Sequence, residues 1–70
     1  MITVWEEDFL GDDTANLSVD GRIVGHVSPT GASWAVFYGA EMIAIRPDKV
    51  AAQGALLKYH MEQRAAERSG

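Results

Sequence analysis

The dipeptide Asp20-Gly21 constrains the fold of this chain more than any other feature of its sequence. One run of alternating apolar and polar residues ends at this dipeptide, and a second run starts directly after it. A tight type I′ turn needs a positive φ at both of its central residues, and Asp-Gly tolerates this conformation. The pattern therefore predicts an antiparallel hairpin with a two-residue turn.

Further signals extend this hairpin into a meander. Ser28-Pro29-Thr30-Gly31 and Gly39-Ala40 have turn compositions, and the aromatic run between them is typical of a central strand. Because short loops favour pairing of consecutive strands, we expect four to five antiparallel strands in one sheet. The expected strands cover about residues 1–5, 15–20, 22–28, 33–38 and 42–45.

A helix is expected to follow the sheet, over about residues 47–67. Pro47 suits the first turn of a helix, and Asp48 would lie near the positive end of the helix dipole. An apolar stripe at helical spacing should pack on one face of the sheet, with Gly54 allowing close approach. The stripe consists of Val50, Gly54, Leu57, Met61 and Ala65. The predicted fold class is α+β, a meander closed by one C-terminal helix.

Size and composition restrict the chain further. Its 70 residues form one domain, residues 1–70, and the absence of cysteine excludes disulfides and thiolate zinc sites. No apolar stretch approaches the ~20 residues of a membrane helix, and the N-terminus lacks the features of a signal peptide. We therefore expect a cytoplasmic protein without membrane attachment.

Charge is distributed unevenly along the chain, whose net charge is −4. Residues 1–20 contain six acids and no base, while residues 21–70 contain four acids and six bases. Nucleic-acid binding depends on neutralising phosphates, so the acidic N-terminal part makes nucleic acid an improbable partner.

The acidic stretch of residues 6–13 has three interpretations. A divalent-cation loop is one, but the spacing does not match the alternating ligands of such loops. An acidic surface that imitates nucleic-acid phosphates toward a basic partner is the second. A solvated loop that keeps the protein soluble is the third. The candidate partner-binding residues are Glu6, Glu7, Asp8, Asp12 and Asp13, with Trp34 and Tyr38 as aromatic contacts.

No catalytic constellation is evident. His26 is expected to be exposed on a strand face shared with Arg22 and Val24, away from Ile23. His60 is expected at the surface or at the boundary of the core. Serine nucleophiles lack an evident base, and no phosphate-binding loop is present. We expect a protein that is not an enzyme and needs no cofactor or metal.

The aromatic central strand raises the question of cover. Trp34 and Tyr38 point to one face of this strand and Phe37 to the other, while one helix covers only one face. A homodimer of about 15 kDa could bury the second face, since twofold dimers are the commonest assembly. Alternatively, a strongly curled sheet would bury both faces in a monomer.

The segments Asp20–Val27 and Gly31–Val36 resemble a pattern found in small phage and prophage orphan proteins. In that pattern a DG-R-x-x-G hairpin precedes a G-x-x-W-A strand and a short alanine-rich helix. The resemblance covers residues 16–60 and implies a mobile-element origin, and such proteins include anti-CRISPR inhibitors. The outline is also similar to the arm-type DNA-binding domains of phage integrases. Those are basic on the sheet, where this chain offers only Arg22 and Arg46.

These observations favour a non-catalytic phage-type accessory protein that binds a host protein, most concretely an anti-CRISPR-like inhibitor of a nucleic-acid-binding complex. A small DNA-binding module and a self-associating structural domain are the alternatives.

Overall fold

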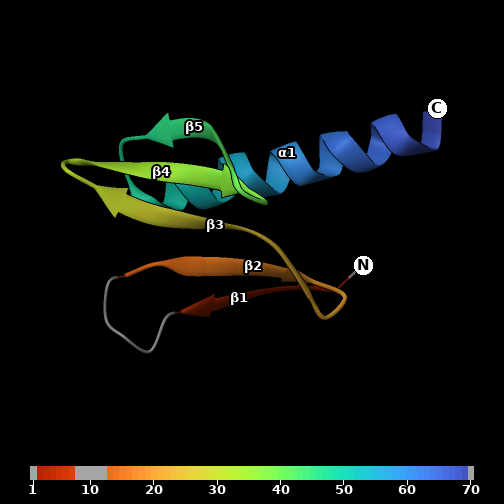
Figure 1. Cartoon of the computed structure of the whole chain (residues 1–70), viewed down its shortest axis with the longest axis horizontal. Helices are drawn as coiled ribbons and strands as arrows, with labels where there is room; N and C mark the ends of the chain where they lie inside the picture. The colour runs from red at the N-terminus through yellow and green to blue at the C-terminus, as the bar shows by residue number, and fades with distance from the viewer. Residues whose placement is uncertain (1, 8–12, 70) are drawn as a thin grey trace.

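The computed structural model describes residues 2–7 and 13–69, with five strands followed by one helix. All neighbouring strands are antiparallel, and their spatial order follows the chain, so the sheet is a meander (Figure 1). This confirms the predicted α+β class. The elements are β1 Thr3–Glu7, β2 Ala15–Val19, β3 Arg22–Thr30, β4 Ser33–Tyr38, β5 Glu41–Arg46 and α1 Lys49–Ser69.

Two of the three predicted turns are confirmed. Asp20 and Gly21 have φ values of 52° and 85° and join β2 to β3 as a two-residue turn, with Val19 paired to Arg22. Gly39, whose φ is 62°, begins the turn between β4 and β5. Positive φ at these positions is the conformation that the Asp-Gly and Gly signals predict.

The predicted turn over residues 28–31 is wrong in position. β3 continues to Thr30, and the turn comes at Gly31, whose φ is 59°. Pro29 lies within the strand opposite Trp34. The pairing of β2 with β3 ends at Val27, so Pro29 has no partner on the β2 side, where its missing N–H would matter.

The helix begins two residues later than predicted. Lys49 is its first residue, and Asp48 is the N-cap, whose Oδ1 accepts a hydrogen bond of 2.8 Å from the Ala51 N–H. An N-cap carboxylate satisfies one of the free amide donors of the first helical turn. Pro47 therefore lies just before the cap instead of within the helix.

The predicted stripe is not the face that the helix packs against the sheet. The buried helix residues are instead Ala52, Leu56 and His60, each four positions apart. Val50 is 78% exposed and Met61 52% exposed, so the prediction that they face the sheet is wrong. Of the predicted stripe, Leu57 is the member that packs against the core.

Close approach of helix and sheet depends on a different glycine from the one predicted. A Cβ at Gly54 would meet nothing within 4 Å, so this residue serves no close contact. A Cβ at Gly25 on β3 would collide with the backbone carbonyl oxygen of Phe37 and lie 2.9 Å from Leu56 Cδ1. The absence of a side chain at Gly25 therefore lets Leu56 settle on the sheet.

The helix covers the sheet face that carries Trp34, Val36 and Tyr38, a choice that the sequence leaves open. It lies across β3, β4 and β5, and in Figure 1 it passes behind them, so that the opposite face is turned to the viewer. The buried apolar residues of this core are Ala15, Leu17, Val19, Val27, Val36, Ala52 and Leu56.

The first strand is tied to the start of the helix. The Nζ atom of Lys49 lies 2.6 Å from Oε1 of Glu7 at the end of β1. Both side chains remain partly exposed, so the pair adds at most about 1 kcal/mol. It links the end of β1, at one edge of the sheet, to the start of the helix. Within the described residues, no helix is both long enough and apolar enough to span a membrane.

Candidate interaction surface

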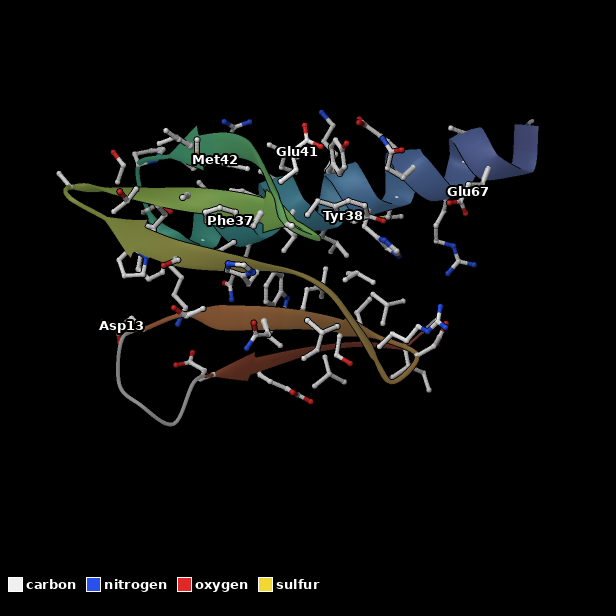
Figure 2. The ribbon with its side chains drawn as sticks, in the orientation of Figure 1. Asp13, Phe37, Tyr38, Glu41, Met42 and Glu67 are labelled. Atoms are coloured by element: carbon white, nitrogen blue, oxygen red, sulfur yellow. The ribbon has the colours of Figure 1, made fainter. Side chains whose placement is uncertain are left out.

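Three of the predicted acidic contact residues can be located. Glu6 and Glu7 are neighbours on β1 and point to opposite faces of the sheet, because side chains alternate along a strand. Glu7 is engaged with Lys49, as described above. Asp13 is exposed, with a φ of 61°, just before β2 (Figure 2). The structure therefore does not gather these three acids on one face.

The remaining acidic candidates, Asp8 and Asp12, lie outside the described residues. Of the three acidic candidates that the structure describes, Glu7 pairs with Lys49, which leaves Glu6 and Asp13 as candidates for charged contacts with a partner. Within the described ranges, no three His, Asp or Glu side chains come together in a way that could hold a metal ion.

The predicted aromatic contacts lie on the helix side of the sheet. Lys49 Nζ is 5.9 Å from the centre of the Trp34 ring, which is half-buried. Tyr38 packs edge-to-face on Tyr59, with ring centres 4.9 Å apart. Both aromatic side chains therefore contribute to packing within the molecule, and neither belongs to the group of large exposed apolar residues.

His60 is buried, in contrast to its predicted place at the surface or boundary. Its Nδ1 lies 3.1 Å from the hydroxyl of Tyr38, and 7% of the residue is exposed. Its Nε2 is buried without a hydrogen-bond partner among the described atoms. The hydrogen bond with Tyr38 explains why a histidine is tolerated on the inner face of the helix, because it gives His60 one polar partner.

The face of the sheet opposite the helix, which we call the outer face, carries a row of five cross-strand neighbours. In register across all five strands these are Glu6, Asn16, His26, Phe37 and Met42. The rings of His26 and Phe37 stack at 4.6 Å with an angle of 12° between their planes. His26 is therefore half-buried against Phe37 and not fully exposed as predicted.

Large apolar side chains extend this row. Ile23 is 63% exposed, and Met42 and Ile45 are each 52% exposed. Val4 faces Ser18, which in turn faces Ile23, so these residues continue the outer face at its other end. Figure 2 shows Phe37 and Met42 on the adjacent strands β4 and β5. The outer face is thus an apolar surface that no element covers among the described residues.

A β-bulge accounts for the place of Ile23. The register between β2 and β3 shifts between Leu17 and Ser18, so that Gly25 and Ile23 oppose consecutive residues. The extra residue reverses the alternation, which brings Ile23 to the same face as His26. The expectation that these two residues lie on opposite faces is therefore wrong.

Charge on the outer face is sparse. Among the described residues, Glu6 is the one Asp, Glu, Lys or Arg on this face. Arg22 pairs with Val19 and Arg46 with Trp34, so both cations belong to the helix side. Arg22 is the first residue of β3, and Arg46 is the last residue of β5. Because β3 and β5 each run antiparallel to β4, they run in the same direction, and the two cations lie near opposite ends of the sheet.

Comparison with protein-family models, curated proteins and solved structures finds no match to this chain. The candidate surface therefore rests on geometry alone. Sequence reasoning missed most of this surface, but one signal was available. The run Met42–Ile45 is apolar at four consecutive positions, and therefore on both faces of its strand. A strand with one solvated face normally alternates with polar residues, and that departure was the available signal.

Proposed function

We propose that this chain is a non-catalytic protein-binding module and that the outer face of its sheet is the contact surface. The observation that supports this most is the exposure of Ile23, Met42 and Ile45 on one uncovered sheet face. Apolar surface that a fold leaves uncovered commonly marks an interaction site.

The chemistry of the outer face favours one kind of partner. Its centre offers the stacked pair of His26 and Phe37 beside Met42, and large aromatic and methionine side chains are enriched in the desolvated centres of interfaces. Glu6 lies at the end of this row. A fitting partner therefore presents an apolar patch with a Lys or Arg at one margin, where an exposed ion pair would favour one orientation.

A protein partner fits this face better than a nucleic acid does. Phosphate contacts need cations, and the described part of the outer face has none, while Arg22 and Arg46 are separated on the helix side. The alternative of a small DNA-binding module therefore has less support than the protein-binding function.

The proposal has a direct test in a binding experiment with matched variants. Wild-type protein, Ile45→Glu and the control Val50→Glu are immobilised and exposed to a bacterial cell extract, and retained proteins are identified by mass spectrometry. Val50 is the more exposed of the two positions and lies on the helix, so its variant introduces the same charge elsewhere. A partner retained by wild type and Val50→Glu but lost by Ile45→Glu, and then reproduced with both purified proteins, supports the proposal. Equal retention by the wild type and both variants contradicts it.

A narrower form of the proposal names the partner as a nucleic-acid-binding complex, inhibited in the manner of anti-CRISPR proteins. Its support is the resemblance over residues 16–60 together with the acids of residues 1–20, of which Glu6 lies on the outer face. The test is target-DNA cleavage by guide-loaded CRISPR effectors with and without the protein. Inhibition that Ile45→Glu removes and Val50→Glu retains is the expected result. Unchanged cleavage by every effector tested rejects this narrower form.

A further inference from the structure

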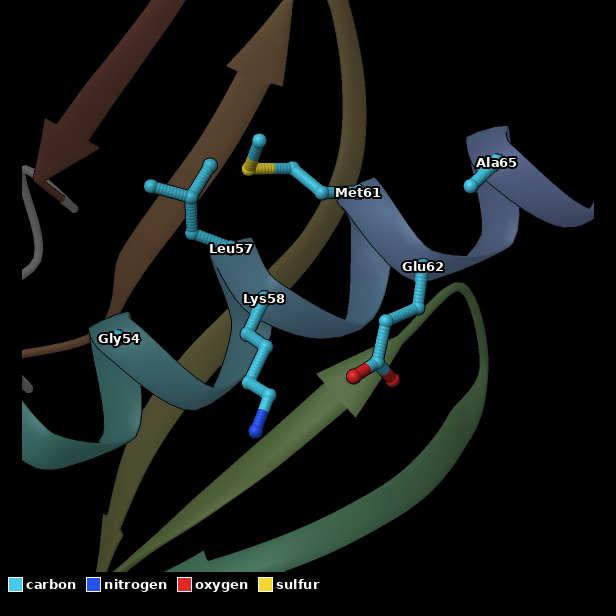
Figure 3. A pocket seen from close by; sticks show the side chains of 6 residues that line it. All are labelled: Gly54, Leu57, Lys58, Met61, Glu62 and Ala65. Carbon is cyan, nitrogen blue, oxygen red and sulfur yellow. The ribbon is translucent and has the colours of Figure 1, made fainter.

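A second apolar surface lies on the helix, separate from the outer face of the sheet. It is an open groove of ≈ 510 Å³ with mainly apolar walls. Figure 3 shows Leu57 and Met61 along one side of this groove and Lys58 and Glu62 along the other. Gly54 and Ala65 lie at its two ends, and four of the lining residues belong to the stripe that the sequence predicts to face the sheet.

The groove continues onto a part of the helix that the sheet does not support. His60 is the last buried helix residue, and none of the residues described from 61 to 67 is buried. Figure 1 shows the C-terminal end of α1 extending past the strands. Met61 is 52% exposed at this point. Helices of this kind gain most of their stability from packing an apolar face, and the sheet buries none of the described residues beyond His60.

The residues that line the groove are complementary to themselves under twofold symmetry. When two copies of α1 lie antiparallel about an axis between residues 59 and 60, each side of the groove meets the same side of the second copy. Leu57 then faces Met61 of the second copy, and Lys58 faces Glu62. The small residues Gly54 and Ala65 face each other at the ends, where they let the helices approach closely. The midpoints of all three pairs fall within one residue of each other.

We infer that this groove binds a second copy of the chain, as an antiparallel pair of α1 helices. The argument for this occupant is charge complementarity: on the charged side of the groove, Lys58 and Glu62 each face the opposite charge of the symmetric partner, which an arbitrary apolar helix would not supply. One helix pair buries less than the ~1,200–2,000 Å² of standard interfaces, so the dimer is weak and forms at high protein concentration. The outer face of each sheet takes no part in it.

Charge exchange at positions 58 and 62 tests this arrangement. Lys58→Glu places two acids opposite each other twice in the dimer, and Glu62→Lys does the same with two bases. Each single variant should therefore raise the dimer dissociation constant about tenfold or more in sedimentation equilibrium. A mixture of the two variants should recover the wild-type dissociation constant, because both acids of one variant then face both bases of the other. The double variant should recover it alone.

Controls separate this inference from other modes of assembly. Glu67→Lys makes the same charge change on an exposed helix position outside the groove and should leave the dimer unchanged. Met61→Glu should abolish the dimer while the circular dichroism spectrum stays the same. A wild-type protein that remains monomeric at millimolar concentration overturns the inference. So does a failure of the mixed variants to recover association, or a dimer that Ile45→Glu disrupts and Met61→Glu does not.

Discussion

Leu56 rests on Gly25: a Cβ at Gly25 would lie 2.9 Å from the Cδ1 atom of Leu56 and would collide with the Phe37 carbonyl oxygen. The helix can pack closely on β3 because Gly25 has no side chain. Leu56 shares the buried face of the helix with Ala52 and His60, while Val50 and Met61 lie on the exposed face.

The first prediction compares the two glycines that the helix–sheet contact distinguishes. Gly25→Ala should lower the free energy of unfolding by about 1–3 kcal/mol or more, because the added methyl group overpacks a contact that includes backbone. Gly54→Ala should raise it by up to about 1 kcal/mol, because alanine favours the helix and its Cβ meets open space. Chemical denaturation at low protein concentration measures both. Equal effects of the two substitutions would contradict the docking described here.

The second prediction compares two neighbouring leucines. Leu56 is fully buried, and Leu57 is half-buried at the edge of the core. Leu56→Ala should cost about 2–5 kcal/mol, and Leu57→Ala clearly less, because less apolar surface returns to water. Thermal unfolding followed by circular dichroism gives the order of the two. If Leu57→Ala were the more harmful, the helix would pack through the predicted stripe after all.

The third prediction concerns the start of the helix. Asp48→Ala should cost about 0.5–2 kcal/mol, because the Ala51 N–H loses its capping acceptor. Asp48→Asn keeps a capping oxygen and should cost much less. Denaturant midpoints of the three proteins distinguish capping from the charge of Asp48, since a purely electrostatic role would make the two variants alike.

The fourth prediction concerns Tyr38 and His60. Tyr38→Phe should lower the free energy of unfolding by about 1–3 kcal/mol, because Nδ1 of His60 is then buried without a partner, as its Nε2 already is. Adding His60→Leu should recover much of this loss, because both polar groups are then gone. A double-mutant cycle measures the coupling, and additive effects would mean that the hydrogen bond contributes nothing.

The sequence predicts the fold well where the chemistry is local. The turns at Asp20-Gly21 and Gly39 follow from residues that tolerate positive φ. The helical segment follows from its composition. In contrast, two helix faces compete for the sheet, and the more apolar one, with Val50 and Met61, is the exposed one.

Most of the proposed contact surface could not be predicted, because long-range register decides which residues share the outer face. The bulge at Leu17/Ser18 moves Ile23 to the outer face, and nothing local to Ile23 signals that shift. Likewise, the contact between Gly25 and Leu56, which lies on the buried helix face, joins residues distant in sequence. Alternation along the central strand separates its two faces, but it does not show which of them the helix leaves free.

The central claim is that the protein has two separate exposed apolar surfaces, the outer face with Met42 and the helix groove with Met61. Labelling of methionine methyl groups with carbon-13 reports on both at once, when a soluble paramagnetic agent is added and the protein concentration is raised. We expect both methyl signals to broaden strongly in dilute protein, and Met61 alone to become protected as concentration rises. Protection of Met42 in dilute protein, or of Met42 in place of Met61 at high concentration, would contradict this account.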